Sequence, residues 1–182
     1  MIIGIAGTLG AGKGTVVEYL RQKGFAHYSS SDTLRQILTE RGLPIDREHM
    51  SALANELSAT QPGGVLHTAH TLAQEAGHEN YILEALHRVS EGEYIKKIGG
   101  TILGVDADIK TRYERITKRG DSAKDNVSFE QFQADSLRED EGATGSGPNI
   151  RAVMAMADHV IMNDGTVAEL HEQIEVWLQT RK

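Results

Sequence analysis

Short apolar segments and helical patterns alternate along the chain. A short β-branched run at residues 2–5 predicts a buried strand, and short segments at 25–29, 81–83, 101–105 and 160–162 predict four more strands. Helical spacing of apolar residues follows in 13–22, 31–42, 50–57, 65–73, 108–119 and beyond the Thr166 to Glu169 capping box. Strands that are apolar throughout are typical of a parallel sheet covered on both faces. The pattern therefore predicts a three-layer α/β/α fold with a five-stranded parallel sheet.

Two segments interrupt this alternation. Residues 31–76 are helical without a strand, their first helix capped by Ser30 or Ser31, and residues 120–148 are polar and rich in glycine, with a short helix around Phe129 and Phe132. Ligands bind at the carboxyl ends of the strands in open α/β sheets. We therefore interpret both segments as insertions at that edge of one domain spanning residues 1–182, rather than as separate domains.

The segment from Gly7 to Thr15 is the strongest motif. Its sequence, GTLGAGKGT, matches G-x-x-x-x-G-K with the threonine one place later than usual, because Gly14 intervenes. Glycines let backbone N–H groups surround phosphate oxygens at a helix N-terminus, and Lys13 would reach the β- and γ-phosphates. The alternative is a plain glycine turn, but the predicted strand and helix flank the motif as a phosphate-binding loop requires.

The form G-x-x-G-x-G-K-G-T resembles the loop of adenylate kinases and related nucleoside monophosphate kinases. Four later segments are similar to segments of that family in order and spacing: SSSDTLR at 29–35, YILEALHR at 81–88, VDAD at 105–108 followed by Arg115 and Arg119, and DHVIMNDG at 158–165. The last is also similar to dephospho-coenzyme A kinases. The chain departs from the family at 84–87, where Glu-Ala-Leu-His replaces an Asp-Gly and Pro pattern, and in its short lid segment.

The resemblance implies a role for each matched residue. Transfer of the phosphoryl group would depend on Lys13, Arg88, Arg115 and Arg119. ATP would be bound by Gly7, Gly10, Ala11, Gly12, Lys13, Gly14, Thr15, Asn163 and Gly165. The acceptor would be bound by Ser30, Asp32, Arg35 and Arg88, and Mg²⁺ by Thr15 and Glu84. Residues 31–76 would hold the acceptor, and 120–148 would close over the donor as a lid.

Several of these residues also have simpler interpretations. Asp32 fits a helix cap, Arg35 a solvated helix position, and residues 163–165 a plain turn. Arg112 shares a helical stripe with Arg115 and Arg119, and we expect it at the surface.

The roles of two further groups of residues are open from the sequence. His67 and His70 are spaced to share a helix face, but we expect surface histidines rather than a metal site. Three basic residues flank the lid segment and could close over ATP, with no motif to choose among them: Lys124, Arg138 and Arg151.

These features predict an ATP-dependent phosphotransferase that moves the γ-phosphoryl group of Mg-ATP to a small phosphorylated nucleotide, first of all a nucleoside or deoxynucleoside monophosphate. One alternative is an enzyme with a hydroxyl acceptor, like dephospho-coenzyme A kinase. Another is a nucleotide-binding regulatory module with weak turnover.

The composition limits the partners, the chemistry and the cellular location that we expect for this protein. The net charge of −7 argues against a nucleic-acid partner. No apolar run approaches the ~20 residues of a membrane span, and the N-terminus lacks a secretion signal. The absence of cysteine excludes disulfides and thiolate chemistry. We expect a cytoplasmic monomer or small homo-oligomer that needs Mg²⁺ and has no membrane partner.

Overall fold

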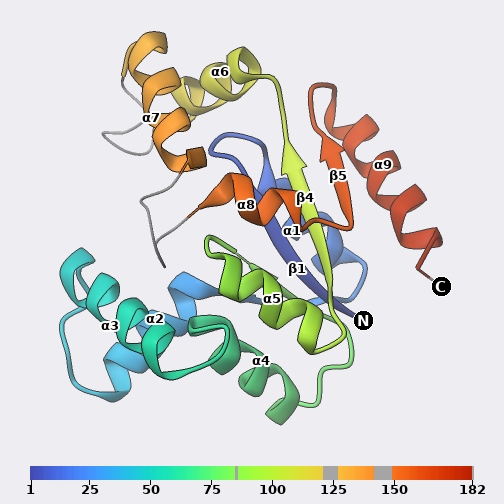
Figure 1. The fold of residues 1–182 in the computed structure, drawn as a ribbon. Coiled ribbons are helices and arrows are strands. Elements are labelled where there is room, and N and C mark those ends of the chain that lie inside the picture. Colours follow the sequence, from blue (N-terminus) through green and yellow to red (C-terminus); the bar gives the residue numbers. More distant parts are fainter. Residues whose placement is uncertain (85, 121–126, 142–148, 182) are drawn as a thin grey trace.

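The computed structural model describes residues 1–84, 86–120, 127–141 and 149–181. Within these residues, a sheet of five strands runs in the order β2-β3-β1-β4-β5, and every pairing is parallel (Figure 1). The strands are β1 (Ile2–Gly7), β2 (Ala26–Ser29), β3 (Tyr81–Glu84), β4 (Thr101–Asp106) and β5 (His159–Met162). The predicted fold class is confirmed, with the strands at the expected places.

Helices cover both faces of the sheet. On one face lie α1 (Lys13–Gln22) and α9 (Val167–Gln179), whose apolar side chains pack with Ile3, Ile5 and Leu103. On the other lie α4 (Val65–Glu75), α5 (Val89–Lys97) and α8 (Ile150–Ala155), which pack with Ala6, Leu83 and Ile102. Neighbouring residues of the three central strands, β1, β3 and β4, therefore face different helix layers, which explains why these strands are buried and mostly apolar.

The two predicted insertions lie at opposite sides of the molecule. Helices α2 (Ser30–Glu40) and α3 (Arg47–Thr60) pack with the start of α4 around a smaller core of Leu34, Leu38, Leu53, Leu57 and Val65. Helices α6 (Ile109–Arg119) and α7 (Phe129–Glu141) pack together at the other side, at the top of Figure 1. None of the helices described here is long and apolar enough to cross a membrane.

Three helical features differ from the predictions. The sequence pattern did not predict α5 or α8, because only four residues of α5 and two of α8 are buried, which leaves little amphipathic signal. Helix α7 is 13 residues long rather than short. The cap of α2 is Ser29, whose hydroxyl oxygen accepts a hydrogen bond from the backbone of Asp32 at 3.0 Å. The expected cap at Ser30 or Ser31 was therefore wrong by one residue or two.

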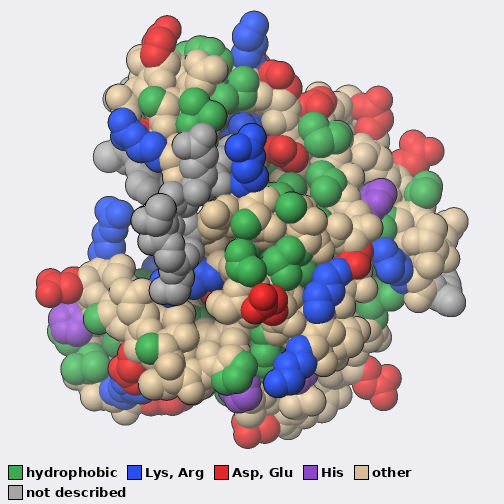
Figure 2. Space-filling view, viewed as in Figure 1, with side chains coloured by type: hydrophobic (Ala, Val, Ile, Leu, Met, Phe, Trp, Pro, Cys, Tyr) green, Lys and Arg blue, Asp and Glu red, His purple; other side chains and the backbone are tan. Residues whose placement is uncertain are grey.

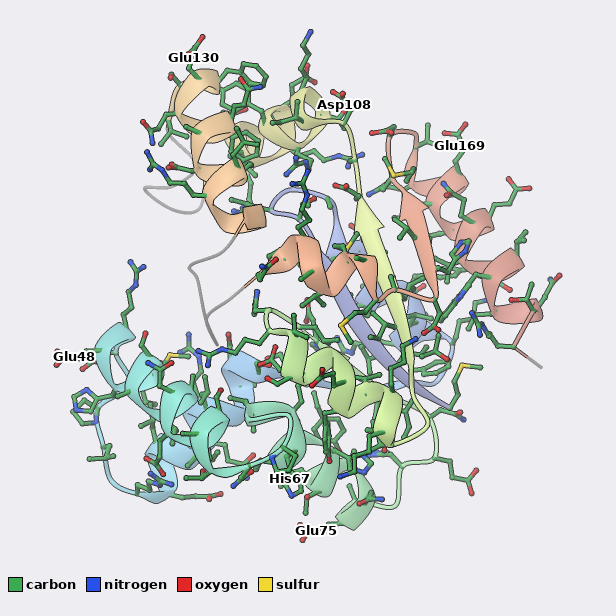
Figure 3. The ribbon with its side chains drawn as sticks, viewed as in Figure 1. Glu48, His67, Glu75, Asp108, Glu130 and Glu169 are labelled. Atoms are coloured by element: carbon green, nitrogen blue, oxygen red, sulfur yellow. The ribbon has the colours of Figure 1, made fainter. Side chains whose placement is uncertain are left out.

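A cluster of histidine and tyrosine rings lies between α4, α5 and β3, and it corrects the expectation that both α4 histidines are surface residues. His70 is only 9% exposed, and its Nδ1 is hydrogen-bonded to the Tyr81 hydroxyl at 2.7 Å. The His67 ring is half-buried and lies against Tyr94, and Figure 3 labels His67 beside α4. The described residues contain no group of three metal-ligating side chains, so these rings form a packing cluster.

Two glycines provide a matched test of packing around α4. Gly63 and Gly77 both have positive φ angles, 79° and 72°. A Cβ on Gly63 would overlap the Tyr94 ring, whereas a Cβ on Gly77 would meet nothing within 4 Å. We expect Gly77→Ala to lower the free energy of unfolding by about 1–2 kcal/mol through backbone strain. Gly63→Ala should cost about 1–3 kcal/mol more through overpacking. Equal losses in urea unfolding would contradict the described Tyr94 contact.

The His70 environment predicts a pH-dependent stability. Burial lowers the pKa of His70, and the nearby His67 adds to this effect, so the unfolded chain binds the proton more readily than the native protein. Stability should therefore fall as the pH drops below the ordinary histidine pKa of about 6.5. His70→Asn keeps a hydrogen-bond acceptor but does not titrate, so its unfolding free energy should fall less over that range. The control is His159→Asn, at an exposed position of β5. This variant should lose as much unfolding free energy over that pH range as the wild-type protein.

Candidate active site

The loop between β1 and α1 is a backbone-lined turn that requires glycine at two places. Gly10 and Gly12 adopt left-handed conformations, with φ of 81° and 95°. A Cβ on Gly10 would lie 2.7 Å from the Arg112 carbonyl oxygen, and one on Gly12 would collide with Nδ2 of Asn163. Gly12 also caps α1 without any side-chain hydrogen bond, so the positive end of that helix faces the loop. The predicted phosphate-binding loop has the geometry that anion binding needs.

Lys13 lies across this loop. Its ammonium group donates hydrogen bonds to the carbonyl oxygens of Gly7 and Thr8, each at 2.9 Å. The side chain is only partly exposed. Both bonds hold the charge over the loop, which is where the phosphates of a nucleotide would be bound.

Residues of β4 and α6 contact the phosphate loop. One of them, Arg112, corrects an expectation from the sequence. Thr8 donates to Asp106 Oδ1 at 2.6 Å, and Arg112 Nε lies 3.8 Å from the same oxygen. Arg112 is 6% exposed and also donates to the carbonyl of Ala107 at 3.1 Å. The expected surface position of Arg112 was therefore wrong. Its guanidinium holds loop and strand together, a role that helical spacing alone does not reveal.

Asn163 braces the other side of the loop. Its side chain is 5% exposed and donates from Nδ2 to the Ala11 carbonyl at 2.8 Å, while its backbone N–H donates to Asp106 at 2.8 Å. The next residue, Asp164, accepts a hydrogen bond from the backbone of Asp108, which Figure 3 labels at the start of α6. The segment at 163–165 is therefore joined to the phosphate loop. Contact of Asn163 and Gly165 with the adenine stays a prediction.

Arg115 carries an unusual feature. Its Nη1 atom is buried, and no described residue accepts a hydrogen bond from it. An unpaired buried guanidinium nitrogen is costly, which is consistent with a site that receives an anion. Arg119 is exposed in the last turn of α6. The structure thus places the two predicted arginines on one helix but in different surroundings.

Arg88 begins α5 and extends toward the α2–α3 region. Its Nη2 donates to Asn55 Oδ1 of α3 at 2.8 Å, and its backbone N–H donates to the buried Glu91 carboxylate at 3.0 Å. Burial raises the pKa of Glu91, while these backbone hydrogen bonds oppose that effect. Both ends of Arg88 are therefore fixed. Neither Asn55 nor Glu91 was among the predicted site residues.

Arg35 borders a groove between α2 and α3. The groove has a volume of about 450 Å³, and Arg47 also borders it. Its remaining lining is mostly apolar: Leu34, Ile45, Asp46, Met50, Ser51 and Ala54. Since Asn55 follows Ala54 on α3, Arg88 contacts the helix that forms one wall of this groove. An apolar groove flanked by cations suits a small organic anion.

Ser30 and Asp32 make contacts away from the groove that Arg35 borders. The Ser30 hydroxyl donates to the backbone carbonyl of Glu84 at 3.1 Å, and Ser29 donates to Asp32 Oδ2 at 2.7 Å. Asp32 borders a separate groove along β2, together with His27 and His78. The structure therefore does not bring Asp32 into the groove bordered by Arg35, and acceptor binding by Ser30 and Asp32 stays a prediction.

The predicted magnesium ligands lie near the ends of β3 and β1. Glu84 Oε2 accepts a hydrogen bond from His27 Nε2 at 2.7 Å, and Oε1 takes no hydrogen bond from the described residues. Thr15 lies in the first turn of α1. A threonine hydroxyl and a carboxylate supply the oxygen ligands that Mg²⁺ prefers, so the residues present fit a nucleotide-bound Mg²⁺. The two ligands stay a prediction.

The basic residues around the lid segment are only partly described. Lys124 and much of the predicted lid lie outside the described residues. Arg138 pairs with Asp135 on the exposed surface of α7 at 3.0 Å, and Arg151 is exposed on α8. Figure 2 shows Lys and Arg side chains on the surface over α6 and α7 and on the surface over the α2–α4 region. The described contacts do not indicate which of the three residues would close over ATP.

His87 is a residue that motif reasoning missed. Its backbone is held at both sides, because its N–H donates to Glu91 Oε2 and its carbonyl accepts from the Asn149 N–H, both at 2.7 Å. Burial lowers the pKa of its imidazole, the charges of Lys13 and Arg88 lower it further, and Glu84 opposes them. The side chain nevertheless keeps access to solvent. The only sequence signal was a titratable residue close after the carboxyl end of a strand.

Comparison with known proteins is consistent with this geometry. Residues 3–141 match the family described as AAA domain. A UPF0200 protein from Sulfurisphaera tokodaii is 30% identical over 180 residues, covering 98% of this chain and 96% of the relative.

Two of the solved structures with similar folds are titled as kinases. A shikimate kinase from Acinetobacter baumannii, in complex with shikimate, has a TM-score of 0.57 at 17% identity and covers 100% of this chain and 94% of its own. A dephospho-CoA kinase from Campylobacter jejuni has a TM-score of 0.55 at 16% identity, covering 98% and 96%. At such identities the likeness concerns the fold alone. From residues 3–141 and the near full-length similarity, the chain belongs to the AAA domain family and to the UPF0200 family.

Proposed function

We propose that this protein is an ATP-dependent phosphotransferase that moves the γ-phosphoryl group of Mg-ATP onto a small phosphorylated nucleotide. The observation that carries the proposal is that the Lys13 ammonium is hydrogen-bonded across the glycine loop at the start of α1, while Arg88 is hydrogen-bonded to Asn55 of α3. A phosphoryl transfer between two phosphorylated molecules needs cations on both sides of the transfer point. Lys13 belongs to the donor loop, and Arg88 contacts α3, which forms the acceptor groove.

The cations divide into a donor set and an acceptor set. Lys13 and Arg115 belong to the donor side, where the unpaired Nη1 of Arg115 suits the charge that develops on the γ-phosphoryl oxygens. Arg119 is the third proposed cation of this set. Arg88 and Arg35 belong to the acceptor side and would bind an acceptor phosphate bidentately. Mg²⁺, held with ATP by Thr15 and Glu84, would neutralise charge between the β- and γ-phosphates.

The acceptor class has two candidates. The resemblance to nucleoside monophosphate kinases makes a nucleoside or deoxynucleoside monophosphate the first acceptor to assay. A hydroxyl acceptor on a phosphorylated molecule is the second, and the exposed His87, which follows the carboxyl end of β3, is a candidate base for it.

The proposed function is tested by ADP release from Mg-ATP. The assay compares a panel of nucleoside monophosphates, dephospho-coenzyme A and a control without acceptor. Acceptor-dependent ADP release would support the proposal. ATP binding without acceptor-dependent release would instead support a nucleotide-binding regulatory module.

Lys13→Ala should lower kcat by at least about 10²-fold, because it removes a cation from the transferring phosphoryl group. The matched control is Lys23→Ala at the other end of α1, where the lysine pairs with Glu175 on the surface. That variant should retain wild-type kcat. Circular dichroism and the thermal midpoint establish that both variants are folded. A folded Lys13→Ala enzyme with near wild-type kcat would exclude the loop from phosphate binding.

Arg88 and Arg115 should give different kinetic changes. Arg88→Ala should raise the KM of the acceptor by about 10- to 100-fold, the effect of losing one charged hydrogen-bond partner. Arg115→Ala should lower kcat with little change in that KM, because its charge matters during transfer. Asn55→Ala, which removes only the partner of Arg88 on α3, should raise the KM less than Arg88→Ala. An unchanged acceptor KM in Arg88→Ala would remove this residue from the acceptor site.

A further inference from the structure

Glu84, one of the two predicted magnesium ligands, is held by two residues that precede or begin α2. Its Oε2 accepts a hydrogen bond from His27 Nε2 at 2.7 Å, and its backbone carbonyl accepts one from the Ser30 hydroxyl at 3.1 Å. The side chains of His27 and Glu84 are mostly buried, with exposed fractions of 21% and 20%. Water therefore competes less for this hydrogen bond than for one at the surface.

The sheet places the His27–Glu84 pair beside the phosphate loop. The register of β3 pairs Glu84 with Ile5 of β1, two residues before that loop begins. Side chains alternate between the two faces of a strand, and Ile82 packs in the core cluster that β3 shares with α1. Glu84, two residues after Ile82, therefore lies on the α1 face. Thr15 lies in the first turn of α1, so the two predicted magnesium ligands share one face and one edge of the sheet.

The length of the Glu84 side chain gives the contact with His27 a purpose. The family pattern that the sequence resembles has aspartate at this strand end, whereas this chain has glutamate. The added methylene brings one more rotatable bond, and fixing it costs conformational entropy. An ionised carboxylate has only hydrogen-bond acceptors, so Nε2 of His27 carries the shared hydrogen. The bond orients Oε2 of Glu84 and leaves Oε1 available to a ligand.

Residues that orient a ligating carboxylate are part of a metal site, and their loss commonly changes metal affinity by about 10- to 100-fold. On the basis of the proposed phosphotransfer function, in which Glu84 binds the nucleotide-bound Mg²⁺, we propose that His27 is the positioning residue for Glu84. In this role His27 contacts neither substrate nor metal and acts only through the carboxylate.

His78 provides a matched control. It borders the same groove along β2 as His27, but its Nδ1 is hydrogen-bonded to the Tyr28 hydroxyl at 3.0 Å rather than to Glu84. Replacing either histidine removes an imidazole and one hydrogen bond from this side of the sheet. Only the replacement of His27 releases the carboxylate.

The first experiment needs no turnover. The affinity for a non-hydrolysable ATP analogue is measured by calorimetry with Mg²⁺ and with EDTA, and the ratio of the two affinities gives the contribution of the metal. We expect His27→Leu to reduce this ratio by about 10-fold or more, with little change in the affinity in EDTA, because the phosphate loop is intact. His27→Gln keeps a side-chain N–H near the Nε2 position and should recover most of the ratio. His78→Leu should leave it unchanged.

Three results would overturn the proposal. The first is a folded His27→Leu protein with the ratio of the wild-type protein, and the second is a wild-type protein that binds the analogue equally well with and without Mg²⁺. The third is an equal loss of affinity with Mg²⁺ and with EDTA, which would mean that His27 only supports the β2 edge. If His27→Leu is unstable by circular dichroism, His27→Asn replaces it, because its shorter amide does not extend to the Nε2 position.

The second experiment tests whether His27 acts through Glu84. With the best acceptor from the panel, the Mg²⁺ concentration for half-maximal kcat is compared in His27→Leu, Glu84→Gln and the double variant. His27→Leu should raise this concentration, leave the acceptor KM nearly unchanged, and add little once Glu84 is replaced. Fully additive effects would refute action through Glu84.

The two proposals fail in different ways. If no acceptor in the panel produces ADP, the proposed function fails, and the calorimetric ratio still decides the role of His27. Acceptor-dependent turnover with an unchanged Mg²⁺ requirement in His27→Leu refutes only this further inference.

Discussion

The phosphate loop depends on a buried hydrogen bond from a residue 152 positions away in the chain. Asn163 donates from Nδ2 to the carbonyl of Ala11, and the same amide lies so close to Gly12 that no side chain fits there. A loop built largely of glycine loses much conformational entropy on folding. The bracing by Asn163, and by Asp106 through Thr8, holds this loop in one conformation. An anion can then bind without first having to order it.

The parallel sheet brings the charged groups to one edge. Because β1, β3, β4 and β5 run in the same direction, Gly7, Glu84, Asp106 and Met162 end their strands on the same side. The residues that follow these ends supply the loop, His87 with Arg88, the start of α6 and the Asn163 turn. The fold therefore determines the position of the site. Burial of the apolar strands in a parallel sheet places the polar residues that follow them at the same end of the sheet.

The site is asymmetric in its electrostatics. Arg112 is buried and paired with Asp106 beneath the loop, whereas Arg115, one turn later, keeps an unpaired buried nitrogen. Arg88 is held by Asn55 and Glu91 on the other side of the site. Cations that support the fold thus differ from cations available to a ligand, and the difference lies in their partners rather than in their residue type.

The sequence by itself determined the sheet, the phosphate loop and most helices, because apolar periodicity and glycine spacing are local signals. Through a resemblance in order and spacing it also predicted site roles for Lys13, Arg88 and Arg115, which stay predictions. The brief α5 and α8 helices escaped because few of their residues are buried. Arg112 and His70 were expected at the surface, and His87 was not considered, because burial and charge environment come from neighbours distant in the chain. Only the tertiary structure decided which arginine supports the loop and that Asn163 braces it, since both depend on contacts between elements that local sequence patterns do not encode.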